Sequence, residues 1–154
     1  MYLVTVVLTM LVLPVSSMLI EALVFRSNAS LVVLMGKWFV VWAIGMRLFL
    51  AGLRQSTRPD FTAETILGIK GKEVFVVVRE LGFANMALGA VSLCSIFVPT
   101  WVNPCALGGG LFLGLAAIQH LTRENRSASE NLALYSNVFV CGVLLCYGLA
   151  VVAR

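Results

Sequence analysis

Five apolar segments, each long enough to cross a membrane, make up most of this 154-residue chain. They run over about residues 2–25, 31–53, 73–98, 101–121 and 130–153. A helix needs roughly 20 apolar residues to span the hydrocarbon core of a bilayer. Only 12% of the residues are charged, against roughly 25% in a soluble domain, and a soluble core of this size would leave apolar surface uncovered. The sequence therefore predicts an all-α integral membrane protein with five transmembrane helices in one domain, residues 1–154.

The first segment has a second interpretation, as a cleavable signal peptide. Val15-Ser16-Ser17 offers a passable cleavage site. However, the segment has no basic residues at its start, its apolar run is long, and Glu21 follows. We therefore expect this helix to be retained.

The longest link between segments, residues 54–72, contains a short helical pattern. Ala63, Ile66 and Leu67 fall on one helical face, and Gly68 ends the turn. An amphipathic stretch of this kind at a membrane edge is typical of an interfacial helix. We expect a short helix that lies on the membrane surface after the second transmembrane helix.

The basic residues of the links predict an orientation. The second and fourth links, on the side of the N-terminus, carry Arg54, Arg58, Lys70, Lys72, Arg123 and Arg126. The other side has Arg26, Lys37 and Arg154. Basic residues concentrate in cytoplasmic loops, so we expect a cytoplasmic N-terminus and an outer C-terminus. This distribution also explains the net charge of +4, and no basic run with interleaved aromatic residues points to nucleic acid.

Two charged residues, Arg47 and Glu80, lie inside apolar segments that are joined by the same link. Counted from the ends of that link, they lie at similar depth on antiparallel helices. Ionisable groups inside a membrane usually pair with each other. We therefore expect an ion pair between Arg47 and Glu80. The alternative partners are Arg79, which adjoins Glu80, and Arg54, which lies on the same helix face as Arg47.

Small and polar residues follow a helical spacing in the third segment. Gly82, Asn85, Gly89 and Ser92 form a stripe that suits close helix packing. For Asn85 the simplest interpretation is an interhelical hydrogen bond, and the alternative is a place in a binding site. Gly110 and Gly114 form a G-x-x-x-G pattern in the fourth segment, which we also assign to packing.

Three further polar residues point to the same end of the bundle. His120 is the only histidine and ends the fourth segment, whereas Glu130 and Asn137 share a face of the fifth. His120 is either a packed interfacial residue or a proton carrier and ligand contact. Glu130 alone would be interpreted as a solvated loop charge. Their convergence predicts a polar cluster or ligand site that is made of Arg47, Glu80, Asn85, His120, Glu130 and Asn137.

The remaining polar residues have simpler interpretations. Glu21 and Lys37 lie on the opposite side of the membrane, where we expect a structural pair. The four cysteines, Cys94, Cys105, Cys141 and Cys146, contain no C-x-x-C pair and predict neither a disulfide nor a metal set. We expect them to pack as small buried residues.

Segments two to five resemble the DoxX-like class of small bacterial membrane proteins over about residues 37–152. The resemblance rests on the order of four features: Arg47-Leu-Phe-Leu-Ala-Gly52, Phe61-Thr-Ala-Glu64, Arg79-Glu80-Leu-Gly82, and His120 followed by Glu130-Asn131. It implies a four-helix core with an extra N-terminal helix, in a bacterial inner or cell membrane. The chain is similar to an uncharacterised subgroup of that class.

The resemblance implies a membrane subunit or accessory protein of a redox assembly, which binds a quinone-like or lipid-like molecule. Relatives of the class are linked to quinone, thiosulfate or thiol redox systems, and the absence of paired cysteines departs from the thiol pattern. A small-solute or proton-coupled carrier is a second hypothesis, and a structural or oligomerising membrane protein is a third. No nucleophile is spaced to act with His120, so a covalent mechanism has no support. We expect no catalytic activity of the chain's own, and the alternative is an intramembrane isomerase or hydrolase in which Glu80 and His120 do acid–base work. Membrane lipid, a redox membrane partner and a second copy of the chain are the expected partners.

Overall fold

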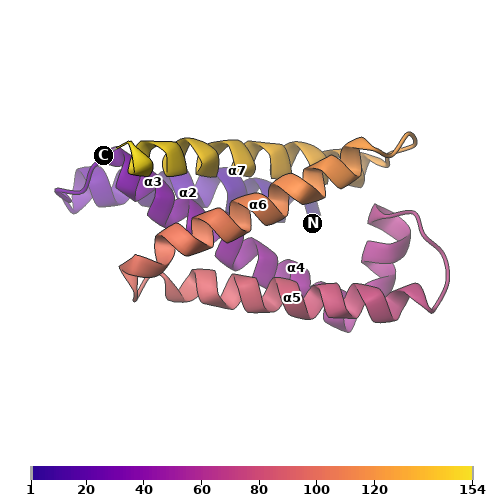
Figure 1. Ribbon diagram of the computed structural model, residues 1–154. Coiled ribbons are helices and arrows are strands. Elements are labelled where there is room, and N and C mark those ends of the chain that lie inside the picture. Colours follow the sequence, from indigo (N-terminus) through magenta and orange to yellow (C-terminus); the bar gives the residue numbers. More distant parts are fainter. Residues whose placement is uncertain (1, 154) are drawn as a thin grey trace.

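The computed structural model describes residues 2–153, and all regular structure in that range is helical (Figure 1). Five helices are long and apolar enough to cross a membrane: Tyr2–Val24, Leu31–Thr57, Val74–Cys94, Pro99–Leu121 and Ala128–Val152. The prediction of an all-α, five-helix membrane protein is confirmed. Arg154, one of the basic residues on the predicted outer side, lies outside the described residues.

Two of the five spans are interrupted by wider, π-helical turns. The first consists of α1 (Tyr2–Val7), η1 (Leu8–Val12), α2 (Leu13–Leu19) and η2 (Ile20–Val24). The second consists of α3 (Leu31–Phe39), η3 (Val40–Met46) and α4 (Arg47–Thr57). In the first span, η1 ends two residues before Pro14. A proline lacks the backbone donor and crowds the carbonyl four residues earlier, so a widened turn there relieves the clash.

The last three spans are α5 (Val74–Cys94), the short η5 (Pro99–Trp101) with α6 (Val102–Leu121), and α7 (Ala128–Val152). The second span extends four residues beyond the predicted end at 53, and α5 ends four residues before the predicted end at 98. Residues 95–97 form a turn before Pro99. A proline disfavours the helical conformation of the residue before it, here Val98, so the helix ends ahead of this position.

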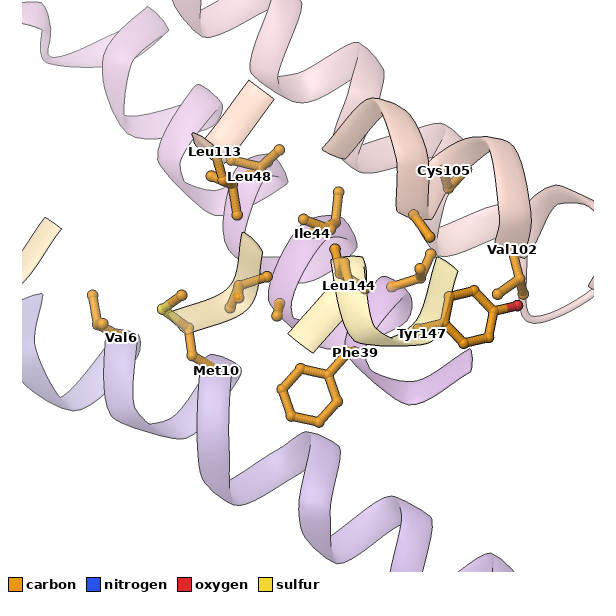
Figure 2. Close-up of a cluster of buried hydrophobic side chains, with 14 residues drawn as sticks. Val6, Met10, Phe39, Ile44, Leu48, Val102, Cys105, Leu113, Leu144 and Tyr147 are labelled. Atoms are coloured by element: carbon orange, nitrogen blue, oxygen red, sulfur yellow. The ribbon is translucent and has the colours of Figure 1, made fainter. Parts of the chain in front are cut away.

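The hydrophobic core forms around the second span. Val40, Ala43 and Ile44 are completely buried. Figure 2 shows side chains of the first, second, fourth and fifth spans meeting there, among them Met10, Phe39, Ile44, Leu113 and Leu144. No buried residue of α5 belongs to this cluster within residues 2–153. From α5, the partly buried Leu88 packs against the edge of this core.

Glycines attach α5 to α4. A Cβ on Gly89 would lie 2.6 Å from the backbone N of Phe49 and 2.8 Å from the carbonyl O of Gly45. A Cβ on Gly82 would lie 2.9 Å from the carbonyl O of Gly52. The stripe predicted from Gly82, Asn85, Gly89 and Ser92 is buried throughout, and its use in close helix packing is confirmed. The other glycine pattern is also confirmed, since Gly110 and Gly114 face Leu144 and Cys141 of α7.

The short helix predicted in the long link is confirmed as η4 (Phe61–Ile66). It packs onto the end of the bundle, where Ala63 is completely buried. The Phe61 and Tyr2 rings meet edge-on, with their centroids 6.3 Å apart. The Arg54 guanidinium lies 4.5 Å from the centroid of the Phe61 ring. Ser127 also donates to the carbonyl O of Thr65 at 3.2 Å. Contacts with α1, α4 and α7 thus hold η4 across this end.

At the opposite end, the predicted pair of Glu21 and Lys37 is confirmed. The Lys37 ammonium donates to both carboxylate oxygens at 2.9 and 2.7 Å, and the Trp38 indole donates to one of them at 2.8 Å. These bonds join the first span to the second.

The expected burial of the cysteines is only partly right. All four are free, and only Cys105 is fully buried, whereas Cys94 and Cys146 are exposed on outer helix faces. A bilayer rather than protein would surround these two thiols. This is consistent with their helices, which present apolar side chains on the same outer faces.

Candidate functional site

A cavity of about 390 Å³ lies inside the bundle near η4. All five spans and η4 contribute to its walls. Most of the wall surface is apolar, although several polar side chains contribute to it. The larger polar side chains on its walls are Tyr2, Arg47, Arg54, Gln55, Asn85, His120 and Asn137. Four of the six residues predicted from the sequence, namely Arg47, Asn85, His120 and Asn137, therefore line the same cavity.

Arg47 begins α4 and lies deep within its span. Its Nη2 donates to the Ser136 Oγ at 3.2 Å and to the Asn137 Oδ1 at 2.8 Å, both on α7. Its Nη1 is buried and has no hydrogen-bond partner within residues 2–153. No carboxylate forms an ion pair with Arg47 in that range. The Tyr2 side chain also interacts with the guanidinium, so the partners of Arg47 among the described residues are hydroxyl and amide groups.

Asn85 extends from α5 toward α4. Its Nδ2 donates to the Gln55 Oε1 at 2.7 Å, which confirms the interhelical hydrogen bond that was the simplest expectation for this residue. The residue is only 4% exposed, and its Oδ1 is buried without a partner in the part of the chain described. An unsatisfied buried acceptor costs about 1–3 kcal/mol. The cavity wall thus holds an unpaired donor and an unpaired acceptor.

His120, the last buried residue of α6, is held by Glu130 of α7. The Nδ1 of His120 lies 3.1 Å from the Glu130 Oε1, and the Arg123 guanidinium lies 3.4 Å from the same oxygen. Glu130 is 2% exposed, so its interpretation as a solvated loop charge is wrong. Because the carboxylate occupies Nδ1, the Nε2 of His120 is the ring atom available on the cavity side.

The turn between α6 and α7 sets this geometry. Arg126 donates through Nη1 to the carbonyl oxygens of His120, Leu121 and Arg123, at 3.3, 3.3 and 2.6 Å. Ser127 caps α7 by accepting from the backbone N of Glu130 at 3.1 Å. The Ser127–Glu130 spacing is that of a capping box, but the carboxylate turns to His120 instead of back to the cap.

We expect Arg126→Ala to lower the stability of this end of the bundle. The last carbonyl groups of α6 would lose a charged donor, which is worth about 1–2 kcal/mol in a partly exposed position. Denaturation of the purified protein in mixed micelles measures the change. Arg58→Ala, on an exposed residue of the other link, should have little effect, and equal losses in the two variants would contradict the role given to Arg126.

The expected ion pair between Arg47 and Glu80 is wrong. Gly45 packs against Gly89, and Gly52 against Gly82. This register places Glu80 at the level of Arg54, two turns or about 10 Å from the level of Arg47. The Glu80 side chain is also exposed on the opposite face of α5 and does not line the cavity. The prediction aligned the helix ends, whereas close glycine contacts decide the register.

Several residues at the cavity were missed in the sequence. Gln55 lies eight residues after Arg47, on an adjoining face of the same helix, so a search along that face would have found it. Ser136 adjoins Asn137 and contacts Arg47. Tyr2 gave no signal, and Phe61 stood out only as part of the resemblance and not as a site residue, because only tertiary packing brings the first span and η4 to this end.

A model of a protein family of unknown function, DUF6790, matches residues 4–153. The chain belongs to this family. No curated protein and no solved structure matches it. The DUF6790 assignment covers nearly the whole chain, first span included, and it is not an assignment to the DoxX-like class.

In this DUF6790 protein the cavity suits an organic ligand better than a metal ion. No group of three or more His, Cys, Asp or Glu residues is close enough to hold a metal among residues 2–153. The cavity volume falls within the range of roughly 300–1,000 Å³ for small-molecule sites, and its mostly apolar wall with a few polar groups has their usual character. Arg47 can donate to a ligand oxygen, and Asn85 can accept from a hydroxyl group. With Nδ1 of His120 donating to the Glu130 carboxylate, its Nε2 accepts in the neutral ring and donates in the imidazolium.

Proposed function

We propose that this multi-span membrane protein binds a quinone-like or lipid-like molecule whose head group occupies the cavity. The observation that carries the proposal is the buried guanidinium of Arg47. It lies on the cavity wall with Nη1 unpaired and without a carboxylate partner among the described residues. A charged group in such a place is costly without a strong acceptor. A ligand oxygen would supply that acceptor.

The other polar groups agree with a head group of this kind. The carbonyl oxygen of a quinone, or the carboxylate of an acidic lipid, accepts hydrogen bonds from Arg47. The Nε2 of His120 is a second donor when it carries a proton, and the Glu130 carboxylate on Nδ1 fixes the ring. In a quinol, the hydroxyl group would donate to the Asn85 Oδ1. Quinones and lipid carboxylates therefore share one requirement, an acceptor oxygen on Arg47.

The order of polar residues that resembles the DoxX-like class supports a role as the membrane subunit or accessory protein of a redox assembly. In that role the chain supplies a binding site and has no catalytic step of its own. The basic links lie at the end of the bundle that holds the cavity. With the N-terminus in the cytoplasm, as the basic links favour, the head group lies near the cytoplasmic face.

Arg47→Met tests the proposal. We expect the purified protein in lipid nanodiscs to bind either a tail-less dimethoxy-methyl-benzoquinone or octanoate, measured by calorimetry. Loss of a hydrogen bond to a charged group, worth about 1.5–3 kcal/mol, should weaken that binding about 10- to 100-fold. Arg47→Lys should restore part of it. Tighter binding of the quinone identifies a quinone-like ligand, and tighter binding of octanoate identifies an acidic lipid.

Arg79→Met is the matched control, because Arg79 is exposed on α5 and does not line the cavity. It should bind the same probe as the unchanged protein does. If neither probe binds, and Arg47→Met changes only the unfolding midpoint, the cluster has a structural role and the proposal is wrong. Mass spectrometry of gently purified protein separately tests for a redox partner or a second copy.

A further inference from the structure

We infer that the cavity opens sideways, between α5 and α6, into the hydrocarbon layer, and that its ligand is a molecule with a long apolar tail that leaves through this opening. This inference rests on the proposed function, since it concerns the tail of the ligand whose head group Arg47 binds. It adds the route of access, and it predicts that a ligand with a tail binds more tightly than a water-soluble ligand that has only the head group.

The first observation is the way α5 is attached. α5 packs closely on α4 through Gly82 and Gly89, makes few contacts with α6, and gives no buried residue to the hydrophobic core. Figure 1 shows α5 and α6 diverging from their shared turn toward the end where η4 lies. The cavity is lined by the parts of the two helices that have separated: Leu81 and Asn85 of α5, and Phe112, Ala116 and His120 of α6.

The second observation is the character of the rim. Leu81 lines the cavity and is also 37% exposed on the outer surface, so it lies where the cavity meets the outside. Leu50 of α4, which is 40% exposed, and the exposed Thr5 of α1 form a second exposed part of the wall, away from α5 and α6. On the facing helix, Phe112 and Ala116 are half-buried on the edge of α6 away from α7. Both helices are candidate membrane spans. An apolar rim inside a span faces lipid tails rather than water.

The third observation is that the other end of the cavity is covered. Phe61, Thr62, Ile66 and Leu67, at or beside η4, line the cavity from the end of the bundle. Phe61 is held there by the Tyr2 ring and by Arg54. A head group that reaches the polar residues past the apolar rim of Leu81, Phe112 and Ala116 would leave its tail between α5 and α6. The apolar rim provides a continuous path for that tail.

Paired probes test the inference. We would measure binding in nanodiscs for the tail-less dimethoxy-methyl-benzoquinone and the same ring with two isoprene units, and likewise for acetate and dodecanoate. In the unchanged protein the tailed member of one pair should bind at least tenfold more tightly. Ala116→Trp narrows the rim and should lower the ratio of tailed to tail-less affinity at least tenfold. Ala87→Trp, on the exposed face of α5, should leave the ratio unchanged.

A crosslinking measurement on the unchanged protein is independent of how Ala116→Trp folds. A probe with a photoreactive group on the first tail carbons should label peptides that contain Leu81 or Ala116. Labelling confined to the first span or to η4, or a ratio that Ala116→Trp does not change, would show that the opening lies elsewhere. If tail-less probes bind in an Arg47-dependent way but tails add no affinity, the inference fails and the proposed function stands. If no probe of either kind binds, both fail.

Discussion

Glu130→Leu is expected to destabilise the bundle by about 3 kcal/mol. The carboxylate is 2% exposed and contacts both His120, at 3.1 Å, and Arg123, at 3.4 Å. Removing one member of a buried pair leaves the other polar groups without compensation, which typically costs about 3–5 kcal/mol, and the half-exposed Arg123 keeps part of its solvation. The unfolding midpoint in mixed micelles, followed by circular dichroism, measures the loss.

Glu124→Leu is the control for this prediction, because Glu124 lies in the same turn and is exposed. It should shift the midpoint by less than about 0.5 kcal/mol, as substitutions of exposed residues usually do. His120→Leu in the Glu130→Leu background should recover part of the loss, since it removes the unpaired imidazole. Equal midpoints for Glu130→Leu and Glu124→Leu would refute the buried pair.

Gly89→Val is expected to separate α5 from α4. A side chain at this position meets the backbone of Phe49 and Gly45, which cannot rotate away as a flexible side chain would. Overpacking of this kind costs about 1–3 kcal/mol, and more where backbone must move. Since the Asn85–Gln55 hydrogen bond depends on the same contact, the function proposed above also predicts weaker binding of the probe. Unfolding in micelles and probe binding together measure the two effects.

Gly108→Val provides the comparison, because no atom outside its own helix lies within 4 Å of a Cβ added at Gly108 of α6. Both changes add the same β-branched side chain to a glycine inside a span, so their helix propensities cancel. Only Gly89→Val should lower the midpoint strongly. A similar loss at both sites would mean that propensity, and not close packing of α4 on α5, governs the result.

The polar end of this protein has two parts, a network of paired side chains and a cavity wall with unpaired polar atoms. His120, Glu130, Arg123 and Arg126 are satisfied by one another and by the turn between α6 and α7. Arg47 and Asn85 each retain a buried atom without a partner within residues 2–153. Satisfied networks stabilise and orient, whereas unsatisfied buried groups beside a cavity suit a ligand.

The sequence by itself determined the class of the protein and the rough position of each span. Long apolar runs leave a helical bundle in lipid as the simplest solution, because backbone groups in hydrocarbon must be satisfied within each helix. The glycine stripe of α5 and the pair of Glu21 and Lys37 were also predicted correctly, since spacing on one helix and charge at a membrane edge are local signals.

Only the tertiary structure decided which polar groups meet. Counting from the link placed Glu80 beside Arg47, but contacts of Gly45 and Gly52 with α5 shift the helices by two turns and turn Glu80 outward. The same structure brings Gln55 to Asn85, buries Glu130 against His120, and folds η4 over the cavity. Helix register and the course of a link depend on van der Waals contact between surfaces far apart in the chain, which no local pattern encodes.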